Sequence, residues 1–489
     1  MKKSRKGSIA LTRASQRSSE VERVESHDEP CSYFVNLPYH IIVHIFLQLS
    51  IKSLLICKCV CKDWKTIISE PHFGKLQFER AQNCFMVRTL DYKRVSRTLY
   101  LLECEPEKFE IGSNSQAKLE PIFKLPLRDA KSFKEIEYLN KAKRPIRVAR
   151  LLALKRKGEN AKRGRQSHYI ATNKDYDKFN IINSCNGLLC LCEPNTRNPI
   201  VICNPVTGEF VRLPKSTTKI RVRNQVKAGL GFHPKTNEYK VIKIWIKHVK
   251  QGNVWVFERV TLEIHTLGTP SWRNVEMDPQ ISISKLKDPT YVNGALHWIM
   301  VEGSILCFCC ESERLQSFPS PTGVFGNHSN GYVAHKHIRM GELKGFLYIC
   351  DSTDFSNVTM WVMNEYGIGE SWSKVYSIDT SVTSMRQPVL LRNGYCWPRK
   401  QFDQGAAILL HHYCNSFIYY EPEKYGFKVF RIHGTSSPFF EVFPHIPSLI
   451  SLKDIVKGDN VEVLNIHSRC AKFKLQEENE VFSLAQEIV

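Results

Sequence analysis

Short apolar strands separated by glycine-containing turns recur along the chain from Phe179 to about residue 433. Each unit has a strand after a glycine turn, a second strand, a polar turn, and a strand that ends near proline or tryptophan. We align the units on Gly187, Gly231, Gly294, Gly345 and Gly394, which are 44, 63, 51 and 49 residues apart. Four-stranded blades that repeat at roughly 40–50 residues are typical of a β-propeller. The pattern therefore predicts an all-β propeller of about six blades, and a β-sandwich of many short strands is the alternative.

The turns and the ends of these units carry residues with a specific structural use. Asparagine–glycine pairs supply the positive φ angles of tight hairpins, and they occur at Asn186-Gly187, Asn293-Gly294 and Asn393-Gly394. Four residues late in the units are interpreted as blade packing and turns: Trp272, Trp372, Pro214 and Pro319. Two β-rich runs, at residues 85–88 and 98–102, precede the repeats.

The stretch Phe34–Pro71 has a helical period instead. Asn36 is a good N-cap residue and proline is tolerated in a first turn, so a helix is predicted to start at Asn36-Leu37-Pro38. Its apolar face consists of Ile42, Ile45, Phe46 and Leu49. Ser50 can cap the next helix, and Pro71 ends the block because it disfavours helix in the residue before it. The later part of the block has helical spacing at Cys57, Val60, Cys61, Trp64 and Ile68.

A helical block this small buries too little surface to be stable alone. Further apolar residues lie off its main faces and predict a second apolar surface: Ile41, Leu47, Leu54, Leu55 and Ile67. That surface either packs on the strand-rich domain or binds another protein, and periodicity alone favours neither reading.

The net charge of +21 comes largely from one stretch. Between Lys141 and Gln166 there are 11 lysines and arginines against one glutamate. A run of this kind is usually a solvated loop, and a nuclear localisation signal or an anion-binding patch is the alternative. The 17 cysteines lie among apolar residues and no secretory signal precedes them, so we expect reduced thiols. No apolar run is long enough for a transmembrane helix.

Motifs for catalysis are absent from the sequence. It has no G-x-S-x-G, P-loop, kinase or H-E-x-x-H motif, and no Cys/His array typical of a ubiquitin-transferring site. His411 and His412 are adjacent in a strand-like run, so they point to opposite faces. The pairs Cys190/Cys192 and Cys307/Cys309 lack the spacing and the second pair of a zinc site. We therefore predict no catalytic residue, no metal and no cofactor, and hence a protein that is not an enzyme.

The helical block resembles an F-box. That family's pattern is a Leu-Pro start, an Ile/Leu-rich helix, a Lys-Ser-Leu turn, then Val-Cys-Lys-x-Trp and an Ile-Ser-(Asp/Glu)-Pro end. The matching positions are Leu37-Pro38, Ile41-Ile42, Ile45-Phe46, Leu49, Lys52-Ser53-Leu54-Leu55, Cys59-Val60-Cys61-Lys62, Trp64 and Ile68-Ser69-Glu70-Pro71. The sequence departs from the pattern at Tyr39-His40 and His44, where acidic residues are usual, and at Ser50, which replaces a common proline. We expect the departures to weaken the polar rim of a docking surface and to leave its apolar contacts in place.

The strand-rich part is similar to the F-box-associated domain of plant F-box proteins, a kelch-like propeller. The motifs that carry this resemblance are NGLLCL, NPVTGEFVRLP, GFHPKTNEYKVIKI, VNGALHWI and FPHIPSLISL. The resemblance implies a mixed fold: a small all-α F-box of about three helices, followed by an all-β propeller with kelch-like repeats. The expected boundaries are a disordered tail at 1–30, the F-box at 31–76, the propeller at 79–455 with a basic insertion at about 141–168, and a C-terminal tail at 456–489.

The two resemblances together imply a substrate-recognition subunit of an SCF-type cullin–RING ubiquitin ligase. The F-box would bind a Skp-type adaptor, and through it the cullin and RING subunits, while the propeller would bind an unknown target protein. The adaptor-binding residues would be Leu37, Pro38, Ile42, Ile45, Leu49, Leu54, Leu55, Val60, Lys62 and Trp64. Trp64 either contacts the adaptor or fills the small core of the F-box. We expect a cytoplasmic or nuclear protein with no membrane partner; the alternative is a basic propeller that binds nucleic acid or chromatin.

Overall fold

The computed structural model of the chain divides into two compact units, residues 1–48 and 49–489, which are described separately. The residues described are 37–89, 98–103, 117–124, 179–193, 197–215, 225–251, 254–278, 281, 283, 286–300, 304–321, 337–353, 357–379, 396–402, 407–412, 416–422, 426–434, 440–456, 461–466 and 482–486. The predicted tail at 1–30, the basic insertion at 141–168 and the pair Asn393-Gly394 lie outside these residues. Within these ranges no helix is both long and apolar enough to cross a membrane.

The first unit holds one described helix, α1 (Tyr39–Leu47). Pro38 is its N-cap residue, with an extended backbone and no side-chain cap. The predicted helix start at Asn36, with proline inside the first turn, was wrong. The proline ring fixes φ but has no side-chain acceptor to offer, so the first turn is left without a cap.

The second unit begins with three more helices: α2 (Ile51–Cys57), α3 (Lys62–Ser69) and α4 (Pro71–Arg80). The predicted cap of α2 is confirmed, because Ser50 Oγ accepts a hydrogen bond from the backbone N–H of Ser53 at 3.2 Å. The single helix expected to run from Cys57 to Ile68 was wrong. Cys61 is extended and caps α3 through its sulfur, so the backbone turns between α2 and α3. Pro71 ends α3 as predicted and also starts α4, since a first helical turn needs no N–H there.

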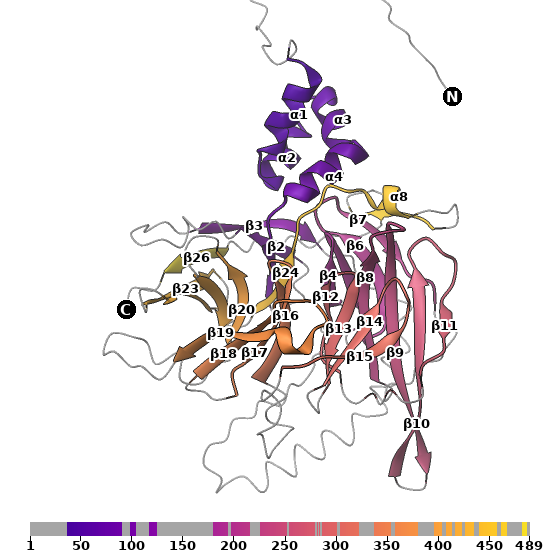
Figure 1. The fold of residues 1–489 in the computed structure, drawn as a ribbon. Coiled ribbons are helices and arrows are strands. Elements are labelled where there is room, and N and C mark those ends of the chain that lie inside the picture. The colour runs from indigo at the N-terminus through magenta and orange to yellow at the C-terminus, as the bar shows by residue number, and fades with distance from the viewer. Residues whose placement is uncertain are drawn as a thin grey trace, which may run out of the picture. The chain divides into compact units, whose positions relative to one another are not determined.

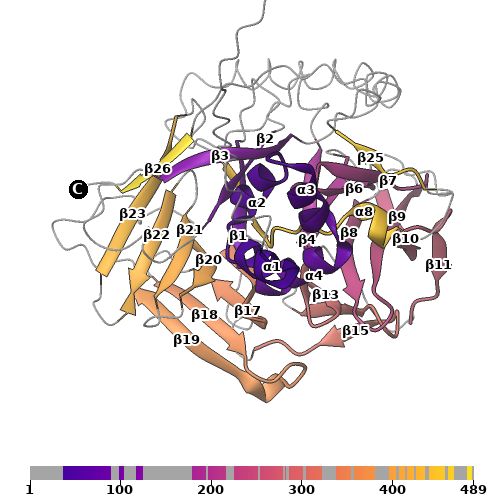
Figure 2. The same cartoon turned by 90° about the horizontal axis from the view of Figure 1, so that it is seen from above.

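After the helices, the chain forms six blades of β-strands, and successive blades follow one another around a ring (Figures 1 and 2). The first blade is β24 (Phe440–His445), β1 (Cys84–Thr89), β2 (Thr98–Leu102) and β3 (Ala117–Lys124). The second is β4 (Asn180–Cys185), β5 (Leu188–Cys192), β6 (Pro199–Asn204) and β7 (Glu209–Arg212). The third is β8 (Gln225–His233), β9 (Glu238–Gln251), β10 (Val254–Thr266) and β11 (Arg273–Val275).

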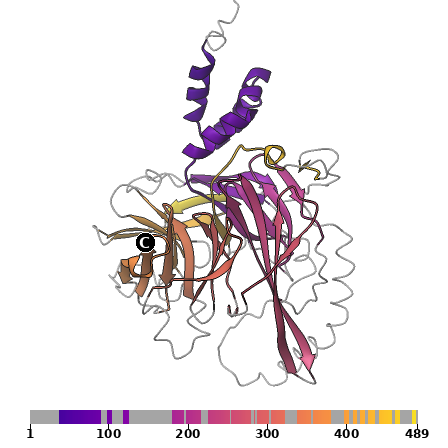
Figure 3. The same ribbon diagram turned by 45° about the vertical axis from the view of Figure 1, so that its right-hand side comes forward.

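The other blades repeat this antiparallel order. The fourth is β12 (Thr290–Val292), β13 (Ala295–Ile299), β14 (Ile305–Cys309) and β15 (Leu315–Phe318). The fifth is β16 (Ile338–Leu343), β17 (Phe346–Asp351), β18 (Asn357–Met363) and β19 (Trp372–Asp379), with the 3-10 turn η3 (Gly369–Ser371). The sixth is β20 (Cys396–Gln401), β21 (Ile408–His412), β22 (Ser416–Glu421) and β23 (Gly426–His433). The predicted six-bladed propeller is therefore confirmed, and β9 and β10 extend beyond the rest of their blade as a two-stranded ribbon (Figure 3).

The ring is closed by strands from both ends of the chain. β24 pairs with β1 over six residues, from Cys84 opposite His445 to Thr89 opposite Phe440. The predicted C-terminal tail also contributes: β25 (Leu464–Asn465) pairs with β7, and β26 (Phe482–Gln486) pairs with both β23 and β3. A short helix, α8 (Leu452–Ile455), precedes these strands. Strand β3, which the sequence pattern did not single out, pairs with β2.

The core lies mainly between neighbouring sheets. One cluster, for example, joins Phe85 and Tyr100 of the first blade to Leu409 and Phe417 of the sixth. Such packing needs apolar side chains on both faces of an inner strand, which is why β5 and β13 are buried along their whole length.

The expected hairpin turns are present where the structure describes them. Asn186 and Gly187 both have positive φ, as do Asn293 and Gly294, and as do Lys344 and Gly345. The alignment of Gly231 with these turns was wrong, because Gly231 lies inside β8. A Cβ at Gly231 would lie 2.6 Å from Cys310 Sγ, so the small residue permits close packing of two blades there.

The prediction that the late tryptophans and prolines serve blade packing is confirmed. Trp272 Nε1 donates a hydrogen bond to the carbonyl of Pro214 at 2.7 Å, linking the third blade to the second. Trp372 Nε1 donates to the carbonyl of Pro319 at 3.2 Å, linking the fifth blade to the fourth. The same pair of residue types therefore fastens neighbouring blades at two places.

Candidate functional site

The ten predicted adaptor-binding residues differ in how much surface they offer. Pro38, Val60 and Lys62 are exposed, and six others are partly exposed: Leu37, Ile42, Ile45, Leu49, Leu55 and Trp64. Leu54 is 0% exposed, so its side chain belongs to the core and presents no surface to a partner. Leu37, Pro38, Ile42 and Ile45 belong to the first unit and the other six to the second.

Two large apolar residues of the α2–α3 region are strongly exposed: Ile56 of α2 at 57%, and Val60, in the turn before α3, at 60%. Ile56 was not among the predicted site residues. Its position could have been found from helix geometry, because two residues along a helix turn through about 200°. Ile56 therefore points away from Leu54, which is buried. Strongly exposed isoleucine and valine side chains in one short segment make it a candidate for contact with a protein partner.

The helix α4 is attached to the propeller by close packing. Phe73 and Gly74 are buried, and a Cβ on Gly74 would lie 3.4 Å from the backbone nitrogen of Ile450. The segment that includes Ile450 is in turn fixed by Glu209 of β7. This carboxylate accepts hydrogen bonds from Ser451 Oγ at 2.9 Å and from the backbone N–H of Leu452 at 2.8 Å. The α4 end of the helical region is thus held on the rigid ring.

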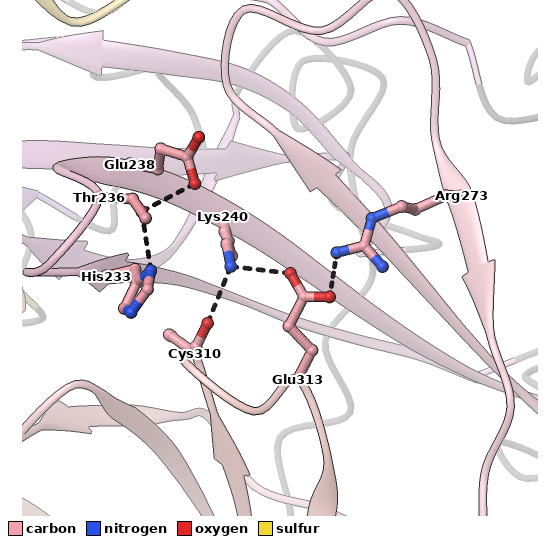
Figure 4. Close-up of polar contacts among 7 residues, drawn as sticks. All are labelled: His233, Thr236, Glu238, Lys240, Arg273, Cys310 and Glu313. Carbon is pink, nitrogen blue, oxygen red and sulfur yellow. Dashed lines mark hydrogen bonds and ion pairs between the residues drawn. The ribbon is translucent and has the colours of Figure 1, made fainter.

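Figure 4 shows two groups of hydrogen-bonded polar residues, one within the third blade and one between the third and fourth blades. The first contains a histidine, a hydroxyl and a carboxylate, the residue types of a hydrolase triad. His233 Nδ1 lies 2.7 Å from Thr236 Oγ1, and Thr236 donates to Glu238 at 2.8 Å. The hydroxyl lies between the imidazole and the carboxylate, so the carboxylate does not orient the imidazole as a base, unlike the order in a hydrolase triad. All three residues belong to the β8–β9 turn, and the chain of hydrogen bonds stabilises that turn.

The second group in Figure 4 joins two blades. Lys240 Nζ donates to the carbonyl of Cys310 at 2.8 Å and to Glu313 at 2.7 Å. Arg273 forms a further ion pair with the same carboxylate. Glu313 has a positive φ of 56°, which presents it to both cations. The group is a clamp between the third and fourth blades. No local sequence pattern indicates it, because its members lie up to 73 residues apart.

Of the histidines and cysteines considered for metal binding, Cys309 is partly exposed and the others are core residues. His411 and His412 are both buried, and His411 stacks against Trp397 with a ring separation of 5.5 Å. Cys190 and Cys192 are buried free thiols, and burial raises the pKa of Cys192 to about 12. In the part of the chain that the structure describes, no three His, Cys, Asp or Glu residues are grouped to hold a metal ion.

Comparison with known families matches both parts of the chain. Residues 34–76 match the F-box domain, and residues 147–455 match the F-box associated beta propeller domain. The second match covers more than half of the chain, and no catalytic domain is evident. Among solved structures, one titled "YCF48 bound to D1 peptide" aligns with 53% of this chain and 89% of its own at a TM-score of 0.27 and 12% identity. That likeness is too low to carry an argument.

Similar curated proteins come from Arabidopsis thaliana. F-box protein At3g07870 is 23% identical over 83% of this chain and 90% of its own length. F-box/kelch-repeat protein At3g23880 is 21% identical over 76% of this chain and 87% of its own length. The fold, the two family matches and these relatives agree with one another. The chain belongs to the plant F-box proteins that carry an F-box-associated β-propeller domain.

Proposed function

We propose that this chain is the substrate-recognition subunit of an SCF-type cullin–RING ubiquitin ligase. The F-box helices bind a Skp-type adaptor, and through it the cullin and RING subunits, in the cytoplasm or the nucleus. The propeller binds a target protein, which is then ubiquitinated and degraded by the proteasome. The receptor itself performs no chemistry, since holding a target near the charged conjugating enzyme raises the effective concentration of the reacting groups.

The observation that carries the proposal is the way the helical region joins the propeller. In the second unit, Ile56 and Val60 are exposed, while α4 packs through Gly74 against the backbone at Ile450. A partner bound at these exposed residues would therefore be rigidly connected to whatever the propeller holds. Proximity catalysis depends on such a fixed geometry, because a freely rotating target would lose much of the effective concentration.

The adaptor surface can be tested with charge substitutions. We expect the double variant Ile56→Asp/Val60→Asp to bind a purified Skp-type adaptor at least about 30-fold more weakly, since losing an apolar hot spot costs roughly 2 kcal/mol or more. The matched control is Val375→Asp, which places the same charge on a valine of β19 that is 44% exposed. Titration by isothermal calorimetry of the full-length proteins gives the comparison, and melting curves verify that all variants remain folded.

Equal adaptor affinity of the double variant and the wild type would contradict the assigned surface. Substrate recognition is tested separately by affinity capture from plant tissue with the proteasome blocked. Proteins that remain bound to the double variant after the adaptor and cullin are lost are candidate targets of the propeller. If every captured protein is lost together with the adaptor, the propeller is not the target-binding part.

A further inference from the structure

A cavity of about 780 Å³ lies among the innermost strands of the propeller. Its walls come from β4, β12, β16 and β24, together with Pro398 and Arg399 of β20. Pockets of roughly 300–1,000 Å³ are the size that holds small molecules and cofactors. The cavity is therefore large enough for a ligand and is built on rigid strands.

The described lining of this cavity is rich in cations. Its basic residues are Arg197, Lys227, Lys287, Arg339 and Arg399, and its carboxylates are Asp288 and Glu342. Both carboxylates already have partners. Asp288 lies 2.5 Å from the guanidinium of Arg197, and Glu342 accepts a hydrogen bond of 2.6 Å from the backbone N–H of Gly345. The lining thus carries more positive charge than its own carboxylates neutralise.

Three of the cations come from three successive blades. Lys287 lies just before β12, Arg339 is in β16 and Arg399 is in β20. Lys287 Nζ and Arg339 Nη1 donate to the same acceptor, the carbonyl oxygen of Ile338. The Nε of Arg399 is shielded from water and has no hydrogen-bond partner among the described residues. Because Lys287 and Arg339 share an acceptor, they lie near one another, and like charges held close together repel unless an anion lies between them.

The surroundings of these cations also shift their pKa values. Burial, with the neighbouring charge of Arg339, lowers the pKa of Lys287 to about 7. Burial also lowers the pKa of Arg399. Burial thus disfavours the charged forms of both groups, and a bound anion would favour them.

A second polar group in the wall also lacks a partner. His445 of β24 is 2% exposed, and its Nε2 is buried without a hydrogen-bond partner in the part of the chain described. Its other ring nitrogen lies 3.0 Å from Ser184 Oγ, which holds the ring in place. Burial lowers the pKa of His445 to about 3, so the ring is neutral near pH 7. A buried polar atom without a partner is costly, and a ligand in the cavity can supply one.

We propose that the central cavity binds a small phosphorylated molecule through Lys287, Arg339 and Arg399, with His445 as a neutral hydrogen-bonding partner. Guanidinium groups match phosphate oxygens in pairs, and a lysine adds a point charge. Because the three cations come from different blades, the ligand would contact three neighbouring blades at once. The proposal does not depend on the ubiquitin-ligase role.

The test uses the full-length protein and inorganic pyrophosphate as the probe, in calorimetric titrations at 0.15 M salt. We expect one saturable site that Arg399→Gln and Arg339→Gln each weaken at least tenfold. Arg399→Lys should restore part of the affinity because it restores the charge. The matched control is Lys374→Gln, which removes one positive charge from an exposed position on β19 and should leave binding unchanged.

Two further measurements test where pyrophosphate binds and whether the natural ligand is a small molecule or a phosphorylated peptide. Changing Lys155, Arg156 and Lys157 of the basic stretch to glutamine should not alter the affinity; loss of binding there, with the cavity variants unaffected, overturns the proposal. The same holds if pyrophosphate shows no saturable binding to the wild type. A phosphoserine peptide is titrated in parallel, and if it saturates the site while pyrophosphate does not, the small-molecule assignment is wrong.

Discussion

The helical region and the propeller solve the problem of burial in opposite ways. The propeller has six sheets with cores between them, and inner strands such as β13 are buried on both faces. The helices α2 and α3 bury few side chains each, namely Ile51, Leu54 and Ile68. Ile56 of α2 and Val60 of the turn between the two helices are exposed. The difference shows which part stands alone. The ring is self-sufficient, whereas the helices rely on α4, on local caps and, in the proposed complex, on a partner.

The largest loss of stability is expected from a substitution at a buried ion pair of the propeller. Lys243 and Glu263 are paired across β9 and β10 and are 0% and 1% exposed. Lys243→Met should lower the free energy of unfolding by about 3–5 kcal/mol, since it leaves a carboxylate buried without its cation. Urea unfolding of the ring, followed by tryptophan fluorescence, measures the loss.

The double variant Lys243→Met/Glu263→Leu provides the matched control, because it removes both charges and should recover most of the stability. Lys374→Met tests the loss of an exposed lysine and should be nearly neutral. A single variant as stable as the wild type would show that the ring tolerates buried charge better than this comparison implies.

An intermediate effect is expected from acid. Burial lowers the pKa of His297 to about 4, while the unfolded chain takes up that proton near pH 6.5. The unfolded state therefore binds more protons below pH 6.5, and stability falls as the pH drops from about 6.5 towards 4. For this one residue the loss between pH 7 and pH 5 is about 2 kcal/mol. Urea midpoints at the two pH values measure it.

The comparison is between variants, since other groups titrate in the same range. His297→Gln should reduce the loss between pH 7 and pH 5 by most of that amount, although it lowers stability at pH 7. His72→Gln, at an exposed position of α4, should leave the pH dependence as in the wild type. Identical pH slopes for all three proteins would disprove the assignment to His297.

The smallest effect is expected in the helices. Ser50→Ala removes the cap of α2 and should cost about 1 kcal/mol of local stability. Hydrogen exchange should then be roughly fivefold faster at the amides of α2, with no change in β5, because the loss is confined to the helix. Ser69→Ala, at an exposed position at the end of α3, is the control. Faster exchange throughout the ring would mean that the two regions unfold together.

Features that depend on a single residue type and its near neighbours could be predicted from the sequence. Ser50 was identified as a cap and Trp272 as a blade-packing residue because each acts through a residue type suited to one short-range role. The break between α2 and α3 was missed because helical spacing continues from Cys57 to Cys61 even though the backbone extends at Cys61. Gly231 was misplaced because a glycine for close packing looks the same in a sequence as a glycine for a turn.

Contacts that form only in the closed propeller could not be predicted from the sequence. The cations of the cavity, Lys287, Arg339 and Arg399, lie in three strand regions about 50–110 residues apart in the chain, and only the closed propeller brings them to one wall. The clamp of Lys240 and Glu313 has the same origin. The adaptor-binding set was chosen by resemblance, which does not separate a buried Leu54 from an exposed Ile56.

Because β24 pairs with β1, the first blade can be completed only after almost all of the propeller has been synthesised. The helices leave the ribosome first, but the strand that completes the first blade, and Ile450 against which α4 packs, come more than 350 residues later. A nascent or C-terminally truncated chain therefore offers helices without the ring that steadies them. In the proposed complex, such a chain would be a poor competitor for the adaptor, so only finished molecules would enter the ligase.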